Sequence, residues 1–200
     1  MATRTIYLIR HGHHDLQNNT GDELGGGLTP TGVKQAELTA QRFRWFPINA
    51  IYTSSLRRAA ETAEIIVREF PDIPLQKSKR LWERIVHVSP KLAESLNTNP
   101  EKMAEQTRLV EKVFEKRFKC AHGHDKHEII VSHGNLIRYF VCRVMQVRPE
   151  AWINMDMCNC GVSEVLIRPD GSMLLVSHSD VGHLPPHLRT YSRKEMPVAL

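Results

Sequence analysis

The sequence predicts an α/β fold: a three-layer α/β/α sandwich whose mostly parallel sheet has an antiparallel strand at one edge. The first supporting observation is an alternation along the chain. Short apolar runs are followed by longer segments whose apolar residues recur at helical spacing, and parallel strands joined by crossover helices have this pattern. The second observation is the turn sequence RPDG at 168–171. It lies between two late apolar runs and predicts an antiparallel hairpin.

The first strand and helix are predicted near the N-terminus. Ile6–Ile9 is a continuous apolar run, as expected for a strand that is covered on both faces. After a glycine-rich loop, Thr29 can cap a helix that has Pro30 at its first position and ends before Pro47. The predicted inner face of this helix consists of Val33, Ala36, Ala40 and Phe43.

The second strand is predicted at 50–54 (AIYTS) and is followed by a helix that ends at Pro71. Ser54 or Ser55 can cap this helix, because a serine hydroxyl accepts hydrogen bonds from the N–H groups of a first helical turn. The predicted inner face of this second helix consists of Leu56, Ala59, Ala63, Ile66 and Phe70.

The remaining segments complete the alternation. Residues 84–99 have no clear periodicity, and no repeat, linker or low-complexity segment divides the chain. We therefore expect one domain over residues 1–200, with a C-terminal tail over 180–200. The later helices are predicted at 99–118 and 135–145, and the later strands at 128–132, 161–167 and 172–176.

Composition excludes several classes of protein. The 200 residues are 41% hydrophobic and 24% charged, which is typical of a globular domain. There is no secretory signal and no run of about 18 apolar residues that could span a membrane. The four cysteines are too few and too unevenly spaced for a disulfide framework. We expect a cytoplasmic protein with no membrane contact in this chain, and a mitochondrial one only if an N-terminal anchor has been removed.

The charge of the chain favours an anionic partner, because the net charge is +5 and there are 11 histidines in addition. No run of five or more basic residues marks a nucleic-acid tail, and no basic strand rich in aromatic residues suggests single-strand binding. A phosphate group on a small molecule or a protein is therefore a better partner than nucleic acid.

Two histidines directly follow predicted strands, and a glycine follows each of them: His11 in LIRHG and His133 in VSHG. Because the carboxyl ends of parallel strands meet at one edge of a sheet, we expect these imidazoles to lie side by side. Arg57 and Arg58 lie at a predicted helix start, where backbone N–H groups favour an anion. We expect Arg57 to be a surface cation and Arg58, next to the buried Ala59, to face the site.

Five segments resemble, in order and approximate spacing, the signature of the histidine phosphatase (phosphoglycerate mutase-like) superfamily: LIRHG, LTPTGVKQA, SSLRRAAETA, LWE and VSHGNLIR. The C-terminal third, with LIRPDGS and GHLPPHLRTYS, is similar to the mitochondrial Ser/Thr protein phosphatase branch called phosphoglycerate mutase family member five. The resemblance implies a phosphoglycerate mutase-like fold. It also implies a phosphatase that needs neither metal nor cofactor, forms a phosphohistidine intermediate and acts on phosphorylated proteins.

The resemblance also implies roles for individual residues. His11 would attack phosphorus, while Arg10, Arg58 and His133 would bind the phosphoryl oxygens. Glu83, in the LWE segment, would protonate the leaving group and later activate water. These roles agree with physical chemistry, because a nucleophilic histidine must be neutral and neighbouring cations lower its pKa.

Three further residues are predicted to bind substrate: Gln17, Gly134 and Asn135. The N–H group of Gly134 or Asn135, at a helix start, would donate to the phosphate. Many members of the superfamily have a threonine soon after the RHG motif and then an asparagine that touches phosphate. This chain has His14 and Gln17 in that region, and the departure leaves the role of Gln17 open.

Alternative functions and sites remain open. A small-molecule phosphomonoesterase or a phosphoglycerate mutase is the alternative within the same class. An inactive phosphate-binding scaffold is the alternative from another class, and the presence of Glu83 argues against it. The loop CAHGHDKH (120–127) has residue types that bind zinc, but we expect it to be solvated and predict no metal site. Expected partners are a phosphorylated protein or small phosphomonoester, inorganic phosphate as product, and a second copy of the chain in a homodimer.

The C-terminal tail is a candidate for substrate recognition. Its His183, His187 and Arg189 are expected at the rim of the pocket, where they would meet the residues that flank a phosphoserine or phosphothreonine. The CNC segment (158–160) is expected to hold two small buried thiols.

Overall fold

A six-stranded sheet forms the centre of the protein. The computed structural model describes residues 1–15, 23–88, 93–94 and 97–191. The strands are ordered β3-β2-β4-β1-β5-β6. The neighbours β3, β2, β4 and β1 run parallel, whereas β5 and β6 form the antiparallel edge. The strands span β1 Arg4–Arg10, β2 Ala50–Ser54, β3 Leu75–Ser78, β4 Lys126–Ser132, β5 Val162–Ile167 and β6 Met173–Asp180.

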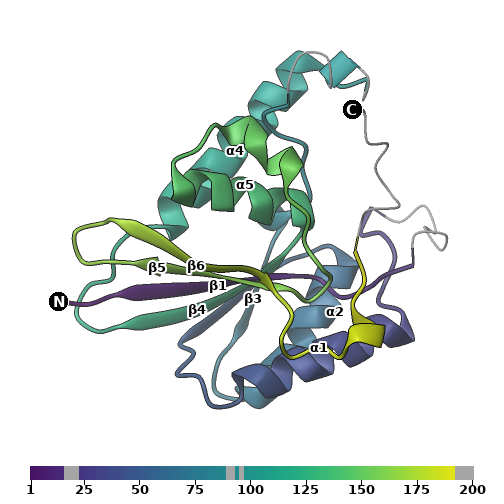
Figure 1. The fold of residues 1–200 in the computed structure, drawn as a ribbon, viewed down its shortest axis with the longest axis vertical. Coiled ribbons are helices and arrows are strands. Elements are labelled where there is room, and N and C mark those ends of the chain that lie inside the picture. The colour runs from purple at the N-terminus through teal and green to yellow at the C-terminus, as the bar shows by residue number, and fades with distance from the viewer. Residues whose placement is uncertain (16–22, 89–92, 95–96, 192–200) are drawn as a thin grey trace.

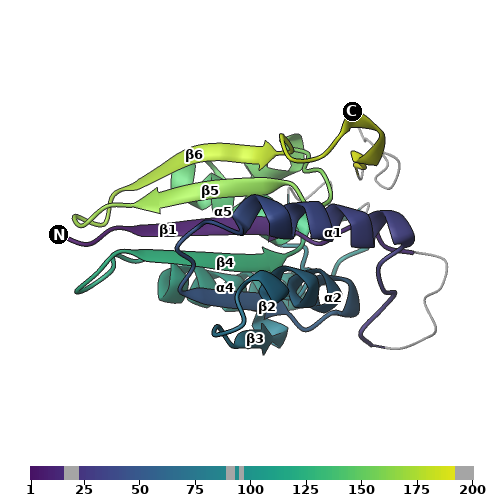
Figure 2. The same ribbon diagram turned by 90° about the horizontal axis from the view of Figure 1, so that it is seen from below.

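Helices cover both faces of the sheet, with α1 and α2 on one face and α4 and α5 on the other (Figure 1 and Figure 2). The predicted three-layer fold with an antiparallel edge is therefore confirmed. The helices span α1 Pro30–Phe43, α2 Arg57–Ile66, α4 Pro100–Arg117 and α5 Gly134–Met145, and short 3₁₀ helices lie at Val67–Glu69, Lys79–Leu81, Pro149–Asn154 and Pro186–Leu188.

The central strand β1 contributes to two hydrophobic cores. Ile6 and Leu8 belong to a cluster with residues of α4 and α5, whereas Tyr7 and Ile9 belong to a cluster with residues of α1 and α2. All four side chains are buried. The run is continuously apolar because successive side chains point to opposite faces and both faces are covered.

One of the two predicted helix caps is confirmed. The Thr29 hydroxyl accepts a hydrogen bond from the N–H of Gly32 at the start of α1. The predicted cap of α2 is wrong, because the N-cap residue is Leu56 and no side-chain cap is formed. Ser54 is the last residue of β2, and its hydroxyl accepts a hydrogen bond from the N–H of Leu56 and also contacts a histidine at the edge of the sheet.

Two other features differ from the predictions. Val33 is 38% exposed, while the polar residues Gln35 and Thr39 are fully buried on the inner side of α1. Strand β3 is not predicted, because LQKS is short and mostly polar. It pairs in parallel with β2 at the edge of the sheet, where a strand needs little apolar surface.

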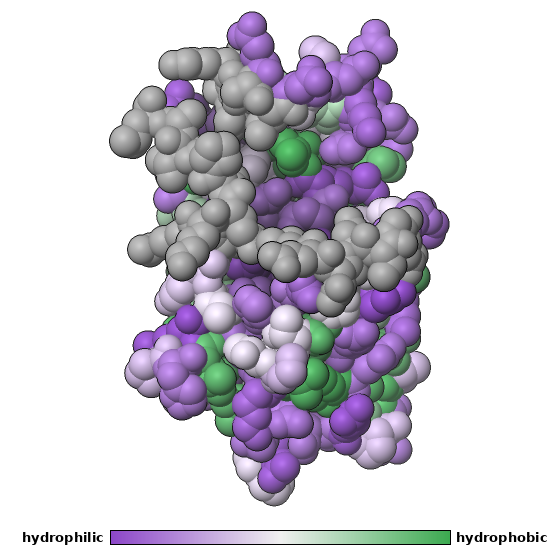
Figure 3. Space-filling model, turned by 90° about the vertical axis from the view of Figure 1, so that its right-hand side faces the viewer, coloured by the Kyte–Doolittle hydropathy of each residue, from purple (hydrophilic) through white to green (hydrophobic). Residues whose placement is uncertain are grey.

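The carboxyl ends of β1, β2 and β4 meet at one edge of the sheet. In the register of β1 with β4, Arg10 lies opposite Ser132, so the residues that follow these two strands are neighbours. Figure 3 views the molecule from this side, and the described surface there is largely hydrophilic. This edge therefore combines polar side chains with the loops that connect strands to helices.

Candidate active site

His11 follows β1 directly, and its imidazole is held as a single tautomer. The residue is 2% exposed. Its Nδ1 lies 2.8 Å from the carbonyl oxygen of Gly12, and because a carbonyl can only accept, Nδ1 carries the proton. Its Nε2 accepts a hydrogen bond from Nε of Arg58 at 3.1 Å. His11 is therefore a neutral imidazole whose unprotonated nitrogen faces a cation.

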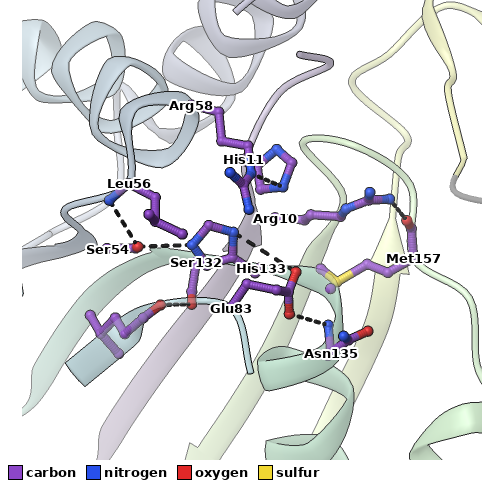
Figure 4. Close-up of polar contacts among 12 residues, drawn as sticks. Arg10, His11, Ser54, Leu56, Arg58, Glu83, Ser132, His133, Asn135 and Met157 are labelled. Carbon is purple, nitrogen blue, oxygen red and sulfur yellow. Dashed lines mark hydrogen bonds and ion pairs between the residues drawn. The ribbon is translucent and has the colours of Figure 1, made fainter. Parts of the chain in front are cut away.

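Burial and positive charge keep His11 neutral. Burial is the largest cause that lowers the pKa of His11 well below its usual 6.5, and the neighbouring His133 ring and the charges of Arg10 and Arg58 lower it further. Arg58 lies in the first turn of α2, and Arg10 is the last residue of β1. Nη1 of Arg10 donates to the carbonyl oxygen of Met157 at 2.6 Å (Figure 4).

His133 lies beside His11, with the ring centroids 5.1 Å apart. It is fully buried, and its Nε2 lies 2.8 Å from the hydroxyl oxygen of Ser54. Burial, followed by the charges of Arg58 and Arg10, lowers the pKa of His133 well below 6.5. His133 is thus neutral while no anion is bound, and a bound anion would favour its protonated form.

Glu83 is the carboxylate that faces this group. Its Oε2 lies 3.9 Å from Nδ1 of His133, and its Oε1 accepts a hydrogen bond from the N–H of Asn135 at 3.2 Å. Burial raises the pKa of Glu83, although Arg58 and Arg10 oppose the increase. The side chain is still 31% exposed. A carboxyl group with a raised pKa and an open side is suited to exchange protons with a ligand.

Most of the predicted site residues lie together, as Figure 4 shows for His11, Arg10, Arg58, His133, Glu83 and Asn135. Gly134 lies against Arg10: a Cβ atom on Gly134 would be 3.5 Å from Nε of that arginine. The N–H of Asn135, predicted to bind phosphate, has the Glu83 carboxylate as its acceptor in this structure. Gln17 lies outside the described residues.

Two residues of the site are missing from the predicted set, Ser54 and His14. Ser54 ends β2, so the meeting of strand ends that brings His11 and His133 together is the signal that could have identified it. The ring of His14 contacts that of His11 edge-on, with centroids 4.8 Å apart. Burial, Arg58 and Arg10 lower the pKa of His14 to about 4.

The loop CAHGHDKH lies outside this group, whereas the CNC segment lies beside it, because Nδ2 of Asn159 donates to the carbonyl oxygen of His11 at 3.0 Å. His122 and His124 are exposed, and His127 Nδ1 lies 3.2 Å from the hydroxyl oxygen of Tyr7. Within the described part of the chain, no group of three or more His, Cys, Asp or Glu residues is placed to hold a metal ion. Cys158 and Cys160 are buried free thiols.

The prediction that His183 lies at the rim of the pocket is wrong. Its Nε2 lies 3.0 Å from the Thr39 hydroxyl, and its Nδ1 lies 3.2 Å from Nη1 of Arg42. Both partners belong to the last turns of α1, whereas the first turn of α1 lies near the site. Nε of Arg189 donates to the carbonyl oxygen of Leu184, and His187 is exposed. Packing on α1 therefore determines the position of His183.

Comparisons with known proteins agree with this geometry. A family model described as "Histidine phosphatase superfamily (branch 1)" matches residues 6–108 and 88–180. The mitochondrial Ser/Thr-protein phosphatase Pgam5 of Caenorhabditis elegans is 37% identical over 195 residues, which cover 93% of this chain and 66% of that protein. The human PGAM5 is 34% identical over 198 residues, which cover 96% of this chain and 67% of that protein. This chain thus spans about two thirds of the length of these relatives.

Two solved structures have a similar fold. A phosphoglycerate mutase from Plasmodium falciparum has a TM-score of 0.64 and 29% sequence identity, with 92% of this chain and 96% of that chain covered. A putative alpha-ribazole-5'-P phosphatase from Escherichia coli has a TM-score of 0.69 and 19% identity, with 88% and 97% covered. At this low identity the second likeness concerns the fold alone. The predicted phosphoglycerate mutase-like fold is confirmed.

The predicted cytoplasmic location is wrong, because the curated relatives from Caenorhabditis elegans and human are both named as mitochondrial proteins. The prediction depends on composition and on the small number of cysteines. Targeting segments are separable from the folded domain, so the sequence of the domain carries no evidence of the compartment. In the described residues, no helix is both long enough and apolar enough to cross a bilayer.

Proposed function

The chain belongs to the histidine phosphatase superfamily, and on this premise we propose that it hydrolyses phosphomonoesters through a phosphohistidine formed on His11. The observation that carries the proposal is the pair of contacts on the His11 ring. Nδ1 donates to Gly12 and Nε2 accepts from Arg58. An unprotonated nitrogen next to a guanidinium combines a nucleophile with a group that binds the phosphoryl oxygens.

In the first step, Nε2 of His11 attacks phosphorus, so that an N–P bond forms as the ester P–O bond breaks. Arg58 already contacts Nε2, so its guanidinium is within reach of a phosphoryl group at that nitrogen. Arg10 and His133 would supply further donors, and the N–H of Gly134 is an additional candidate. Positioning and charge stabilisation account for most of the catalysis of phosphoryl transfer.

Glu83 serves as the acid in the first step and as the base in the second. It gives its proton to the leaving oxygen, which departs as an alcohol. It then takes a proton from the water that attacks the phosphohistidine, so inorganic phosphate leaves and His11 is again neutral. The raised pKa of Glu83 supports the first role, because the carboxyl group must be protonated before it can donate. The N–H of Asn135 orients the carboxylate.

A phosphorylated serine or threonine in a protein is the proposed substrate. The names of the curated relatives support this class. A cavity of about 510 Å³ is lined by Glu83 and by residues near the start of α4, among them Lys102, Met103 and Gln106. Because Glu83 must face the leaving oxygen, the substrate beyond that oxygen would enter this cavity. Its volume falls in the usual range for ligand sites and supports a substrate larger than a phosphoryl group alone.

A small-molecule phosphomonoesterase or a phosphoglycerate mutase is the second candidate, favoured by the similarity to the Plasmodium falciparum mutase. An inactive scaffold that binds phosphorylated partners is the third. The buried environment that raises the pKa of Glu83 argues against the scaffold, because binding of phosphate needs no proton donor.

The test is turnover by the purified protein in the presence of a chelator. We expect hydrolysis of an aryl phosphate, and a rapid base quench with labelled substrate should trap on the protein a phosphate that is stable in base and released in acid. A panel of phosphopeptides and phosphorylated metabolites should then show higher kcat/KM for the peptides. Complete loss of activity on chelation would contradict the metal-free mechanism. A preferred metabolite would support the second candidate, and phosphate binding without turnover would support the scaffold.

Location and assembly are part of the same proposal. The names of the curated relatives support a mitochondrial location, which fractionation of cells that express the tagged natural protein would test. The homodimer stays a prediction, and analytical ultracentrifugation of the purified chain would test it.

A further inference from the structure

Two buried side-chain amides hold the backbone that surrounds the His11 imidazole. Gln35 in α1 is fully buried, and its Oε1 accepts a hydrogen bond from the N–H of His13 at 2.8 Å. Asn159, which precedes β5, is 4% exposed, and its Nδ2 donates to the carbonyl oxygen of His11 at 3.0 Å. The two amides therefore hold the polar backbone groups on both sides of Gly12.

One of these bonds acts on the peptide group that sets the tautomer of His11. The N–H of His13 and the carbonyl of Gly12 belong to the same planar peptide unit. Gln35 binds its N–H end, and the carbonyl at its other end accepts from Nδ1 of His11. If Gln35 loosened, this peptide plane could rotate and the carbonyl would leave Nδ1. The orientation of the imidazole therefore depends on Gln35.

The other ends of both amides bind a short stretch of the C-terminal tail, Leu188–Thr190, called the C-terminal segment below. Nε2 of Gln35 donates to the carbonyl oxygen of Leu188 at 2.6 Å and to the Thr190 hydroxyl at 2.9 Å. The Thr190 hydroxyl donates to Oδ1 of Asn159 at 2.9 Å. The backbone N–H of Asn159 donates to the carbonyl oxygen of Thr190 at 2.9 Å. The segment lies beside α1 in Figure 1 and Figure 2.

The directions of these hydrogen bonds follow from the backbone groups at their ends. The N–H of His13 can only donate, so the oxygen of the Gln35 amide must face it. The carbonyl of His11 can only accept, so the nitrogen of the Asn159 amide must face it. The remaining NH₂ of Gln35 and the remaining oxygen of Asn159 then need an acceptor and a donor. A hydroxyl group supplies both functions at once, and Thr190 lies between the two amides.

We propose that Thr190 is a positioning residue for the nucleophile, and that the C-terminal segment acts through Gln35 and Asn159 to hold the His11 ring. The inference depends on the proposed function, in which His11 is the nucleophile. It differs from the expectation that the tail recognises peptide substrates. A segment that orients the nucleophile affects every substrate equally, because each of them is attacked by the same nitrogen.

The experiment compares Thr190→Val with Thr190→Ser. Valine keeps the shape of threonine and removes the hydroxyl, whereas serine keeps the hydroxyl. We expect Thr190→Val to lower kcat about tenfold to a hundredfold, since misplacement of a reacting group by about 1 Å has effects of this order. The loss should be equal for an aryl phosphate and a phosphopeptide, and Thr190→Ser should recover most of it. Inhibition by inorganic phosphate should change little, because Arg10 and Arg58 are retained.

Nitrogen NMR of labelled histidine supplies a measurement that does not depend on activity. In the parent protein the His11 resonances should show one neutral tautomer with the proton on Nδ1, and Thr190→Val should shift them toward a mixture. A matched control is Thr3→Val, which removes a threonine hydroxyl that donates to Asp125 at the other end of the molecule. The control should leave both the kcat and the His11 resonances unchanged.

The outcomes separate this inference from its alternatives. Unchanged kcat and unchanged His11 resonances in Thr190→Val would overturn it, and a loss confined to phosphopeptides would assign the segment to recognition. A loss explained entirely by unfolded protein in thermal melts would give Thr190 only a structural role. Should Thr190→Val fold poorly, Asn159→Asp provides a second variant, because it retains the acceptor for Thr190 and removes the donor to His11. If the parent protein forms no phosphohistidine, the proposed function fails, while the NMR result still tests the hydrogen-bond network.

Discussion

An arginine lies at each end of the sheet, Arg4 in β1 at the amino end and Arg58 at the start of α2 at the carboxyl end, and the two donate to different kinds of acceptor. At the amino end, Nη1 of Arg4 donates to both carboxylate oxygens of Glu128 at 3.2 Å, and the two side chains are 10% and 5% exposed. At the carboxyl end, Nε of Arg58 donates to the neutral imidazole of His11. In the first case the acceptor is an anion, and in the second it is a neutral base.

We propose that the difference separates a structural arginine, Arg4, from a catalytic one, Arg58. A buried arginine that contacts a carboxylate has its charge balanced within the fold, and removal of either partner leaves the other buried without compensation. A guanidinium next to a neutral imidazole lowers the pKa of the imidazole and can turn toward a phosphoryl group when one is present. We therefore expect changes at the amino end to affect stability and changes at the carboxyl end to affect turnover.

The largest effect is expected from His11→Ala. Removal of the nucleophile should lower kcat by at least about four powers of ten, while the melting temperature stays near that of the parent. Steady-state assays with an aryl phosphate and a thermal melt would measure the two quantities. A variant that retains more than about a hundredth of the parent rate would assign the nucleophile to another residue.

The next largest effect is expected at the opposite end of the sheet. Glu128→Ala leaves the Arg4 guanidinium buried without its carboxylate, so the free energy of unfolding should fall by about 3–5 kcal/mol. Turnover per folded molecule should not change. Chemical denaturation and an active-site titration would measure both quantities. The double variant Arg4→Met with Glu128→Leu should recover most of the stability, and equal instability in the double variant would show that the pair is not the cause.

Arg58→Ala should reduce kcat/KM by about 10²–10³, because it removes a donor to the transferring phosphoryl group. Inhibition by inorganic phosphate should weaken roughly tenfold to a hundredfold, as expected for loss of a charged hydrogen bond. Arg58→Lys is the matched control that retains the charge without the Nε donor, and its losses should be smaller. Unchanged phosphate inhibition in Arg58→Ala would make Arg57 the next candidate.

The pH dependence of Arg58→Ala supplies an independent check. Activity requires neutral His11, so it is lost as the pH falls through the pKa of His11. The charge of Arg58 lowers that pKa, and its removal should raise the pKa toward 6.5. The acid limb of the kcat/KM profile should therefore move to higher pH in the variant. A shift to lower pH would contradict the assignment of that limb to His11.

The smallest effect is expected from Ser54→Ala. The change leaves Nε2 of the buried His133 without its hydroxyl partner, so the transition state should lose about 1–2 kcal/mol, equivalent to a decrease in kcat of roughly tenfold. Ser163→Ala is the matched control, because it removes a serine hydroxyl 2.9 Å from Nδ1 of His178, which lies in β6. Equal losses of turnover in both variants would mean that Ser54 only stabilises the fold.

Much of the fold and of the candidate site could be predicted from the sequence alone. The alternation of apolar runs and helical stripes indicated the layers, because a strand whose successive side chains are all apolar must be covered on both faces. The position of His11 and His133 after parallel strands was enough to bring them together. The prediction that Arg58 faces the site followed from its position next to the buried Ala59, since such a residue at a helix start lies near the sheet.

The tertiary structure decided the hydrogen-bond partners of three polar residues that the sequence did not predict, Ser54, His183 and Thr190. Ser54 matches the pattern of a helix cap, but its hydroxyl lies against His133, and local sequence does not distinguish these two uses of one hydroxyl. The imidazole of His183 could bind a substrate at the rim of a pocket, but in the structure it packs on α1. Thr190 reaches Gln35 across 155 residues of sequence. A hydrogen bond depends on which groups meet after folding, whereas the periodicity of apolar residues is already present in the chain. For this reason the sequence determined the layers and the strand ends. Only the fold decided which groups form hydrogen bonds around the His11 ring.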